Sequence, residues 1–252
     1  MTNQSRLLAI RLASLSLVLA SCLSLVNNLK AAADINKGYV PPPNRGRAQR
    51  TEAGGSRGCD KNYVALNLLV PSDHIATTTS GHPTFLWYVS ATPSVPMQFT
   101  LVEQNGSKSI LETQVQVKSP GIVKLQLPLN TTDLAIGKQY RWTVSLVCNE
   151  KRPSSNILAQ AVIERVAKTF TLKRDLKATT DERVHARIYA QSGIWYDAIA
   201  SSYHAFNPNE QERLNANAKY FLDLLNSIGL TDIAAQGRLQ RANVSEASRQ
   251  KS

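Results

Sequence analysis

The stretch Gln139-Tyr140-Arg141-Trp142-Thr143-Val144-Ser145-Leu146-Val147-Cys148 decides the fold of this chain. Its apolar residues recur at every second position. As an extended strand, it would carry them all on one face: Tyr140, Trp142, Val144, Leu146 and Cys148. A strand of this kind is typical of a sheet that packs through one face.

Further short β-rich runs surround this strand at intervals of about 12 residues. They cover 63–70, 84–90, 97–103, 109–117, 122–127 and 156–166. Asn105-Gly106 lies between two of them and predicts a hairpin with a type I′ turn. The seven strands predict an immunoglobulin- or fibronectin-like antiparallel β-sandwich over 59–166. The residues before Tyr140 resemble the tyrosine corner of such sandwiches, so we expect its hydroxyl to bond the preceding loop.

Residues 1–33 predict an export signal. Arg6 and Arg11 precede an apolar run over 12–26, and no acidic residue occurs before Asp34. This order is typical of a secretory signal peptide. Cleavage is expected at Ala31-Ala32-Ala33, and the chain is then exported to the periplasm or cell envelope.

Two alternatives for this N-terminal stretch stay open. Leu19-Ala20-Ser21-Cys22 fits a bacterial lipobox, in which Cys22 would be lipidated. An uncleaved run would instead act as a membrane anchor, although it is shorter than a usual span. Membrane association is expected only through the signal or a lipidated Cys22.

Cys59 and Cys148 are the cysteines that remain once Cys22 is removed or lipidated. In an oxidising compartment such a pair is most simply one disulfide. A metal or catalytic pair is the alternative, but the two cysteines lack the short-spaced partners of a zinc site.

Residues 34–58 predict a flexible basic linker. Pro41-Pro42-Pro43 favours polyproline II, and so few apolar residues occur that we expect nothing in this stretch to be buried. Most of the net charge of +11 lies in the signal, in this linker and in a tail at 237–252 that we expect to be disordered. Dispersed cations on an exported protein do not predict nucleic-acid binding, and an envelope protein or an anionic polymer is the expected partner.

After a basic connector at 167–177, residues 178–236 predict a helical module. Thr179-Thr180-Asp181-Glu182 fits a capping box with Thr179 at the cap. Helices are expected up to about 191, over about 194–206 and over about 209–228.

The stretch 193–208 resembles the second helix of a tetratricopeptide repeat. Such repeats bind peptides in arrays, but only one repeat is recognisable and at least three are normally needed. The alternative is a helical hairpin that packs on the sandwich or on a partner. The predicted partner-binding residues are Trp195, Tyr196 and Tyr203.

No segment of the sequence predicts a catalytic, metal or cofactor site. Ser56 fits a G-x-S-x-G pattern, but a nucleophile elbow requires a strand before the serine and a helix after it. Ser72-Asp73-His74 is expected to be a polar turn, because adjacent side chains cannot align as a triad. The histidines show no paired ligand spacing.

Several motifs together resemble one family. They are Pro41-Pro42-Pro43, Arg50-Thr51-Glu52 with 54–59, His82–Val89, Pro120–Val123, Tyr140-Arg141-Trp142 with Cys148, and Gly193–Ala198. This set closely resembles the cyanobacterial domain-of-unknown-function family 928. The resemblance implies an exported cyanobacterial protein without an assigned activity, and it brings no catalytic or binding residues.

The leading hypothesis is a non-enzymatic binding or scaffold module of the cell envelope. Its candidate surfaces are the sheet aromatics and the helical pair Trp195 and Tyr196. The sheet aromatics, Phe85, Trp87, Tyr88 and Trp142, could line a sugar-binding face, but aromatic residues in strands more often belong to the core. One alternative is a carbohydrate-active or other hydrolytic enzyme. Another is a lipoprotein accessory to an envelope secretion or assembly machine.

Overall fold

The computed structural model describes residues 38–43, 46, 64–104, 106, 109–204 and 211–236 of the chain, without the side chains of 153, 204 and 211–217. The chain divides into two units, 1–37 and 38–252, and every described residue belongs to the second. The predicted signal, the tail and the residues Cys22, Ser56 and Cys59 lie outside the described residues.

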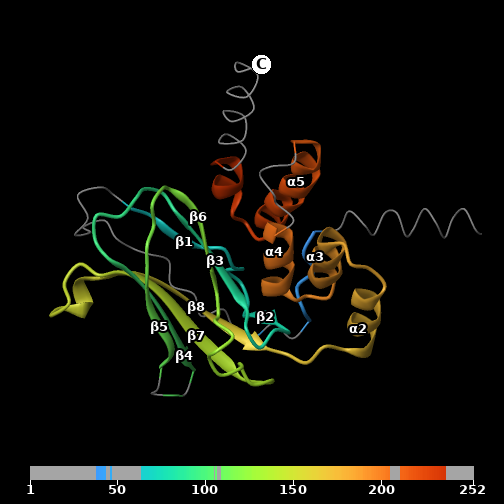
Figure 1. Ribbon diagram of the computed structural model, residues 1–252, viewed down its shortest axis with the longest axis horizontal. Helices are drawn as coiled ribbons and strands as arrows, with labels where there is room; N and C mark the ends of the chain where they lie inside the picture. Colours follow the sequence, from blue (N-terminus) through green and yellow to red (C-terminus); the bar gives the residue numbers. More distant parts are fainter. Residues whose placement is uncertain are drawn as a thin grey trace, which may run out of the picture. The chain divides into compact units, whose positions relative to one another are not determined.

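Within these residues, eight strands form two sheets (Figure 1). The strands are β1 (Leu66–Leu68), β2 (Ala76–Thr78), β3 (Thr84–Val89), β4 (Met97–Glu103), β5 (Ser109–Val115), β6 (Gly121–Gln126), β7 (Gln139–Leu146) and β8 (Ile157–Arg165). One sheet has the order β1-β3-β6 and the other β2-β8-β7-β4-β5. The mainly β, two-sheet architecture predicted from the sequence is confirmed.

The seven predicted strands are present, and the eighth, β2, was missed. It pairs with β8 in parallel, Ala76 opposite Ile163, whereas the other described pairings are antiparallel. Three residues are too few to show a periodicity. Four β-branched residues over 75–79, which are Ile75, Thr77, Thr78 and Thr79, were the available signal.

The hairpin predicted around Asn105-Gly106 is confirmed, because β4 and β5 pair antiparallel across it. Its turn differs from the prediction. The N–H of Gly106 donates to the carbonyl of Glu103 at 2.9 Å. Gly106 is therefore the last residue of a turn that starts at Glu103, and not a central residue of a type I′ turn.

The core between the sheets is aromatic. Phe85 of β3 lies 5.0 Å, between ring centroids, from both Phe99 of β4 and Trp142 of β7. Trp87 stacks on Phe99 at 6.1 Å. These four rings are fully buried and Tyr88 is nearly so. The sheet aromatics therefore do not form the exposed surface that the sequence suggested.

Four helices follow the sandwich: α2 (Phe170–Lys177), α3 (Glu182–Gln191), α4 (Trp195–His204) and α5 (Gln211–Ser227). Residues 231–236 add a further helical turn, as expected. The three helices predicted after Thr179 are confirmed. α2 occupies most of the predicted basic connector. Thr169 caps this helix through Leu172 N, and Arg174 and Lys177 in its last turn favour the negative end of the helix dipole.

The cap of α3 is Asp181, so the predicted cap at Thr179 is wrong. The Asp181 carboxylate accepts from the N–H of Arg183 at 2.9 Å. Thr179 instead accepts from the N–H of Asp181 at 3.1 Å, in the turn that precedes the helix. The Arg183 guanidinium also bonds Asp181, which lowers the pKa of that carboxyl to about 2.

Candidate functional site

The motif that stands out in the helical module, Gly193-Ile194-Trp195-Tyr196-Asp197, lies against the sandwich. Gly193 turns the chain between α3 and α4 with a φ of 76°, a conformation that glycine adopts without strain. Its carbonyl accepts from the hydroxyl of Thr77 in β2 at 3.0 Å. We call these motif residues and their partners on the sandwich the junction.

Both aromatic residues of the motif enter the core. The indole N–H of Trp195 donates to the carbonyl of Leu69 at 2.9 Å. The hydroxyl of Tyr196 accepts from the indole N–H of Trp142 at 2.8 Å, and its ring contacts Phe85. Trp195 is 0% exposed and Tyr196 is 2% exposed. Their burial does not support the prediction that they offer a surface to a partner.

Tyr203, the third predicted partner-binding residue, is partly buried. Its ring lies 5.6 Å from that of Phe221 in α5. Tyr203 therefore packs within the helical module. Sequence reasoning had left two roles open for this module, and the contacts of α4 with β2 and β3 correspond to a hairpin that packs on the sandwich.

Asp197 is the charged member of the junction. One carboxylate oxygen accepts from the hydroxyl of Thr78 at 2.6 Å and from the N–H of Thr79 at 3.0 Å. The other accepts from the hydroxyl of Thr79 at 2.8 Å. Three donors from the end of β2 thus hold one side chain of α4.

Removal from water raises the pKa of Asp197, although these donors and the charge of Lys168 act in the opposite direction. The neighbouring Tyr189 of α3 lies in the same environment. Its burial, and then the negative charge of Asp197, raise its pKa to about 12. The threonine donors of the junction therefore offset only part of the cost of burying the Asp197 carboxylate.

The predicted polar turn at Ser72-Asp73-His74 is a bend, but its histidine is buried. Nδ1 of His74 lies 2.7 Å from a carboxylate oxygen of Asp73, and Nε2 lies 2.9 Å from the hydroxyl of Tyr39. Tyr39 is only 8% exposed. The prediction that nothing in 34–58 is buried is therefore wrong.

The loop between β6 and β7, residues 127–138, is the most distinctive surface feature. Leu127 and Leu134 are fully buried, which fixes both parts of the loop to the core. Leu134 N donates to the carbonyl of Gly81 at 3.0 Å, and Gly137 N donates to that of Arg165 at 2.7 Å. The loop is therefore held in place by the rest of the sandwich.

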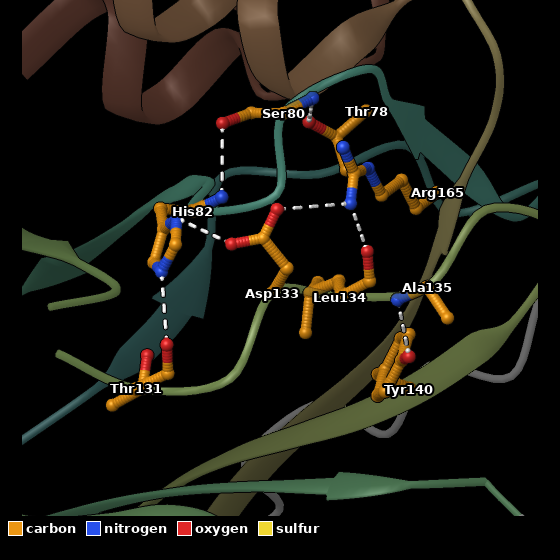
Figure 2. Close-up of polar contacts among 9 residues, drawn as sticks. All are labelled: Thr78, Ser80, His82, Thr131, Asp133, Leu134, Ala135, Tyr140 and Arg165. Atoms are coloured by element: carbon orange, nitrogen blue, oxygen red, sulfur yellow. Dashed lines mark hydrogen bonds and ion pairs between the residues drawn. The ribbon is translucent and has the colours of Figure 1, made fainter. Parts of the chain in front are cut away.

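Figure 2 shows the polar contacts that hold this loop. Asp133 lies between two basic side chains, with His82 Nδ1 at 3.3 Å and Arg165 Nη1 at 3.5 Å. Arg165 Nη1 also donates to the carbonyl of Leu134, and His82 Nε2 lies 3.2 Å from that of Thr131. We call His82, Asp133 and Arg165 the loop cluster.

Tyr140 bonds the same loop, as the sequence predicted. Its hydroxyl accepts from the N–H of Ala135 at 2.8 Å (Figure 2). Residue 135 precedes β7, so this is the expected contact with the preceding loop. The loop is thus held to the sandwich by the buried Tyr140, by the basic side chains of His82 and Arg165, and by backbone hydrogen bonds.

Two large apolar side chains project from this fixed loop. Leu129 is 80% exposed and Ile136 is 60% exposed. Sequence reasoning missed both, together with Asp133. The signal was available: 12 residues between two strands is long for a connection, and long ordered loops are often functional.

The polar groups described here give no metal cluster. Among the described residues, no group of three His, Cys, Asp or Glu side chains could hold an ion. His185 is the remaining histidine whose side chain is described, and its Nε2 lies 3.0 Å from the carbonyl oxygen of Leu176 and 2.9 Å from that of Thr179. No described helix is long and apolar enough to cross a membrane.

Cys148 lies two residues after the end of β7 and is partly buried. Its predicted partner, Cys59, lies outside the described residues, so the pairing of Cys59 with Cys148 stays a prediction.

Comparison with known proteins gives a family and no neighbour of known activity. Neither the search of curated proteins nor that of solved structures found a match. A family model described as Domain of Unknown Function (DUF928) matches residues 52–238, which include the junction and the loop cluster. The chain therefore belongs to the DUF928 family.

Proposed function

We propose that this protein is exported to the periplasm or cell envelope and works there as a non-enzymatic binding or scaffold module. The observation that carries the proposal is the fixed loop 127–138, which displays Leu129 and Ile136. Large apolar side chains that an ordered loop leaves exposed can form part of a protein interaction surface. The partner that fits them is an envelope protein with an apolar patch of its own.

The junction supports the same proposal. Its aromatic side chains, Trp195 and Tyr196, were predicted partner-binding residues, and their partners are sandwich residues. Asp197 bonds Thr78 and Thr79, and Trp195 bonds Leu69. These groups hold the helices on the sandwich, and this structural role fits a non-enzymatic module.

Affinity capture from an envelope extract tests the loop. The bait is the full chain, with Leu129→Ser/Ile136→Ser as the variant. The matched control is Phe170→Ser, because Phe170 is 83% exposed on α2. We expect one stoichiometric protein with the wild type and with Phe170→Ser, and at least about a tenfold loss with the loop variant, since each apolar anchor contributes about 1 kcal/mol or more.

Two results would contradict the proposal. Equal recovery by the loop variant would show that the loop is not the binding surface. Recovery of polysaccharide alone would favour a lectin-like role and contradict the protein partner proposed here.

Export would place Cys148 in an oxidising compartment, where disulfides persist. We propose that Cys148 forms a disulfide with Cys59 there. Peptide mapping of the non-reduced protein should yield a Cys59–Cys148 cross-linked peptide, and a Cys22–Cys148 peptide would contradict it. Labelling with a fatty-acid analogue tests the lipoprotein alternative, because a lipidated Cys22 would take up the label.

The finer fold assignment belongs to the proposal too. The bond from Ala135 N to Tyr140 supports an immunoglobulin- or fibronectin-like sandwich. The antiparallel pair α3 and α4, turned at Gly193, supports a hairpin like a single tetratricopeptide repeat.

A further inference from the structure

Residues 38–43, Gly-Tyr-Val-Pro-Pro-Pro, lie against the junction, and we call them the strap. Tyr39 stacks on the imidazole of His74 at 5.6 Å and meets the ring of Trp195 edge-on at 4.9 Å. Its hydroxyl lies 2.9 Å from His74 Nε2 and also contacts the carbonyl of Gly193 at 3.4 Å. One tyrosine therefore touches the sandwich and the helical module at once.

The rest of the strap follows the turn between α3 and α4. The N–H of Val40 donates to the carbonyl of Ala190 at 3.0 Å, a carbonyl at the C-terminal end of α3. A Cβ at Gly193 would lie 3.2 Å from Pro42 Cδ and from the carbonyl oxygen of Val40. Gly193 is thus required both for its own positive φ and for the close approach of the strap.

The strap site is a tyrosine pocket followed by a surface for an extended chain. His74, Ala190, Gly193 and Trp195 form it, and all four lie inside the residues that match the family model, 52–238. The strap itself lies before residue 52. The residues that the family model matches therefore supply the site, and a segment that precedes them in the chain fills it.

The chemistry of the strap suits a transferable ligand. Consecutive prolines favour polyproline II, which has no internal hydrogen bonds and loses little entropy on docking. Tyr39 supplies a buried anchor, whereas Val40 is 42% exposed and Pro43 is exposed. An anchor residue followed by a stiff extended segment is a common form of peptide ligand.

We propose that the junction carries a docking site for an extended Tyr-Val-Pro-Pro segment, and that residues 38–43 of this chain occupy that site from within. A peptide of the same chemistry binds when the internal tyrosine is removed. This site is separate from the loop 127–138, so the proposal of this site does not depend on the function proposed above.

The test is binding of a fluorescent peptide with the strap sequence to the full chain, followed by anisotropy. The wild type should bind weakly, because its own strap fills the site. Tyr39→Ala should bind the peptide at least about tenfold more tightly. A peptide with alanine for tyrosine should not bind this variant, and one with phenylalanine should bind about 2–10-fold more weakly, because it lacks one hydrogen bond.

The overturning result is a folded Tyr39→Ala variant that binds the peptide no better than the wild type, or that binds the alanine peptide equally well. Circular dichroism and the melting temperature establish that the variant is folded.

A second measurement leaves Tyr39 in place. A specific protease site is inserted between Gly54 and Gly55, and the folded chain is cleaved there. The strap fragment should co-elute with the domain and exchange for excess labelled peptide. Immediate loss of the fragment, or retention without any exchange, would overturn the proposal.

Discussion

The junction and the loop cluster are both polar, and the structure uses them in opposite ways. In the junction, Asp197 is desolvated and bonded by buried threonines. In the loop cluster, Asp133 is 63% exposed between His82 and Arg165. Buried polar groups must be satisfied, so they act on stability, whereas exposed ion pairs add little to it. The comparison teaches that the junction, whose motif stands out in the sequence, holds the helices on the sandwich. The loop 127–138, which does not stand out in the sequence, exposes large apolar side chains to solvent.

The largest expected effect comes from removing a junction ring. Trp195→Ala should lower the free energy of unfolding by about 3–5 kcal/mol, because it leaves a cavity and an unpaired carbonyl at Leu69. Leu129→Ala on the loop should change it by less than about 0.5 kcal/mol. Urea denaturation of both variants measures the difference, and equal losses would remove the distinction between the two regions.

Gly193→Ala should have the next largest effect. The residue has a φ of 76°, so alanine there costs about 1–2 kcal/mol, and its Cβ would also press on Pro42. Gly81→Ala is the matched control in the loop cluster. Its Cβ would overlap the exposed carboxylate of Asp133 and lie 3.2 Å from Arg165 Nη1, and both groups are ends of flexible side chains that can move aside. The melting temperature should fall for Gly193→Ala and remain unchanged for Gly81→Ala.

The titration of Asp197 should make the free energy of unfolding depend on pH. Its pKa is raised in the folded state, so the folded protein holds this proton more tightly than the unfolded chain does. Its contribution to stability is therefore greatest below the ordinary value of 3.8 and falls as the pH rises towards the folded value. The Asp197→Asn variant should lack this fall. Denaturation from pH 4 to pH 8 compares the two, and parallel curves would show that Asp197 does not titrate differently on folding.

The smallest expected effect on stability belongs to the loop cluster itself. Asp133→Asn should change the free energy of unfolding by no more than about 1 kcal/mol, because the Asp133 carboxylate itself is 63% exposed. High salt should reduce even that difference. A larger loss would mean that the loop depends on the carboxylate and not on Leu127 and Leu134.

Sequence reasoning worked where one physical pattern dominates. The alternation around Trp142 predicted a strand and its inward face, and the position of Tyr140 after the loop predicted the bond to that loop. It failed where a residue's role depends on distant partners. The three-residue β2 has no periodicity of its own, and it exists because β8 pairs with it and Asp197 binds its end.

The same limit applies to the site. Trp195 and Tyr196 look like binding residues in sequence, because aromatic residues on a helix suit either a core or an interface. Tyr39 lies in a stretch rich in proline and glycine, whose composition argues against burial. Only the position of His74, across the fold, shows that this tyrosine has a pocket.

The parallel pairing of β2 with β8 affects how the chain folds during its synthesis. Ala76 finds its partner, Ile163, only after the rest of the sandwich has been synthesised. Contacts between residues so far apart in sequence slow folding, because the intervening loop must close first. The larger sheet can therefore be completed only after nearly the whole sandwich has left the ribosome. A nascent chain that ends before β8 lacks the strand with which β2 pairs.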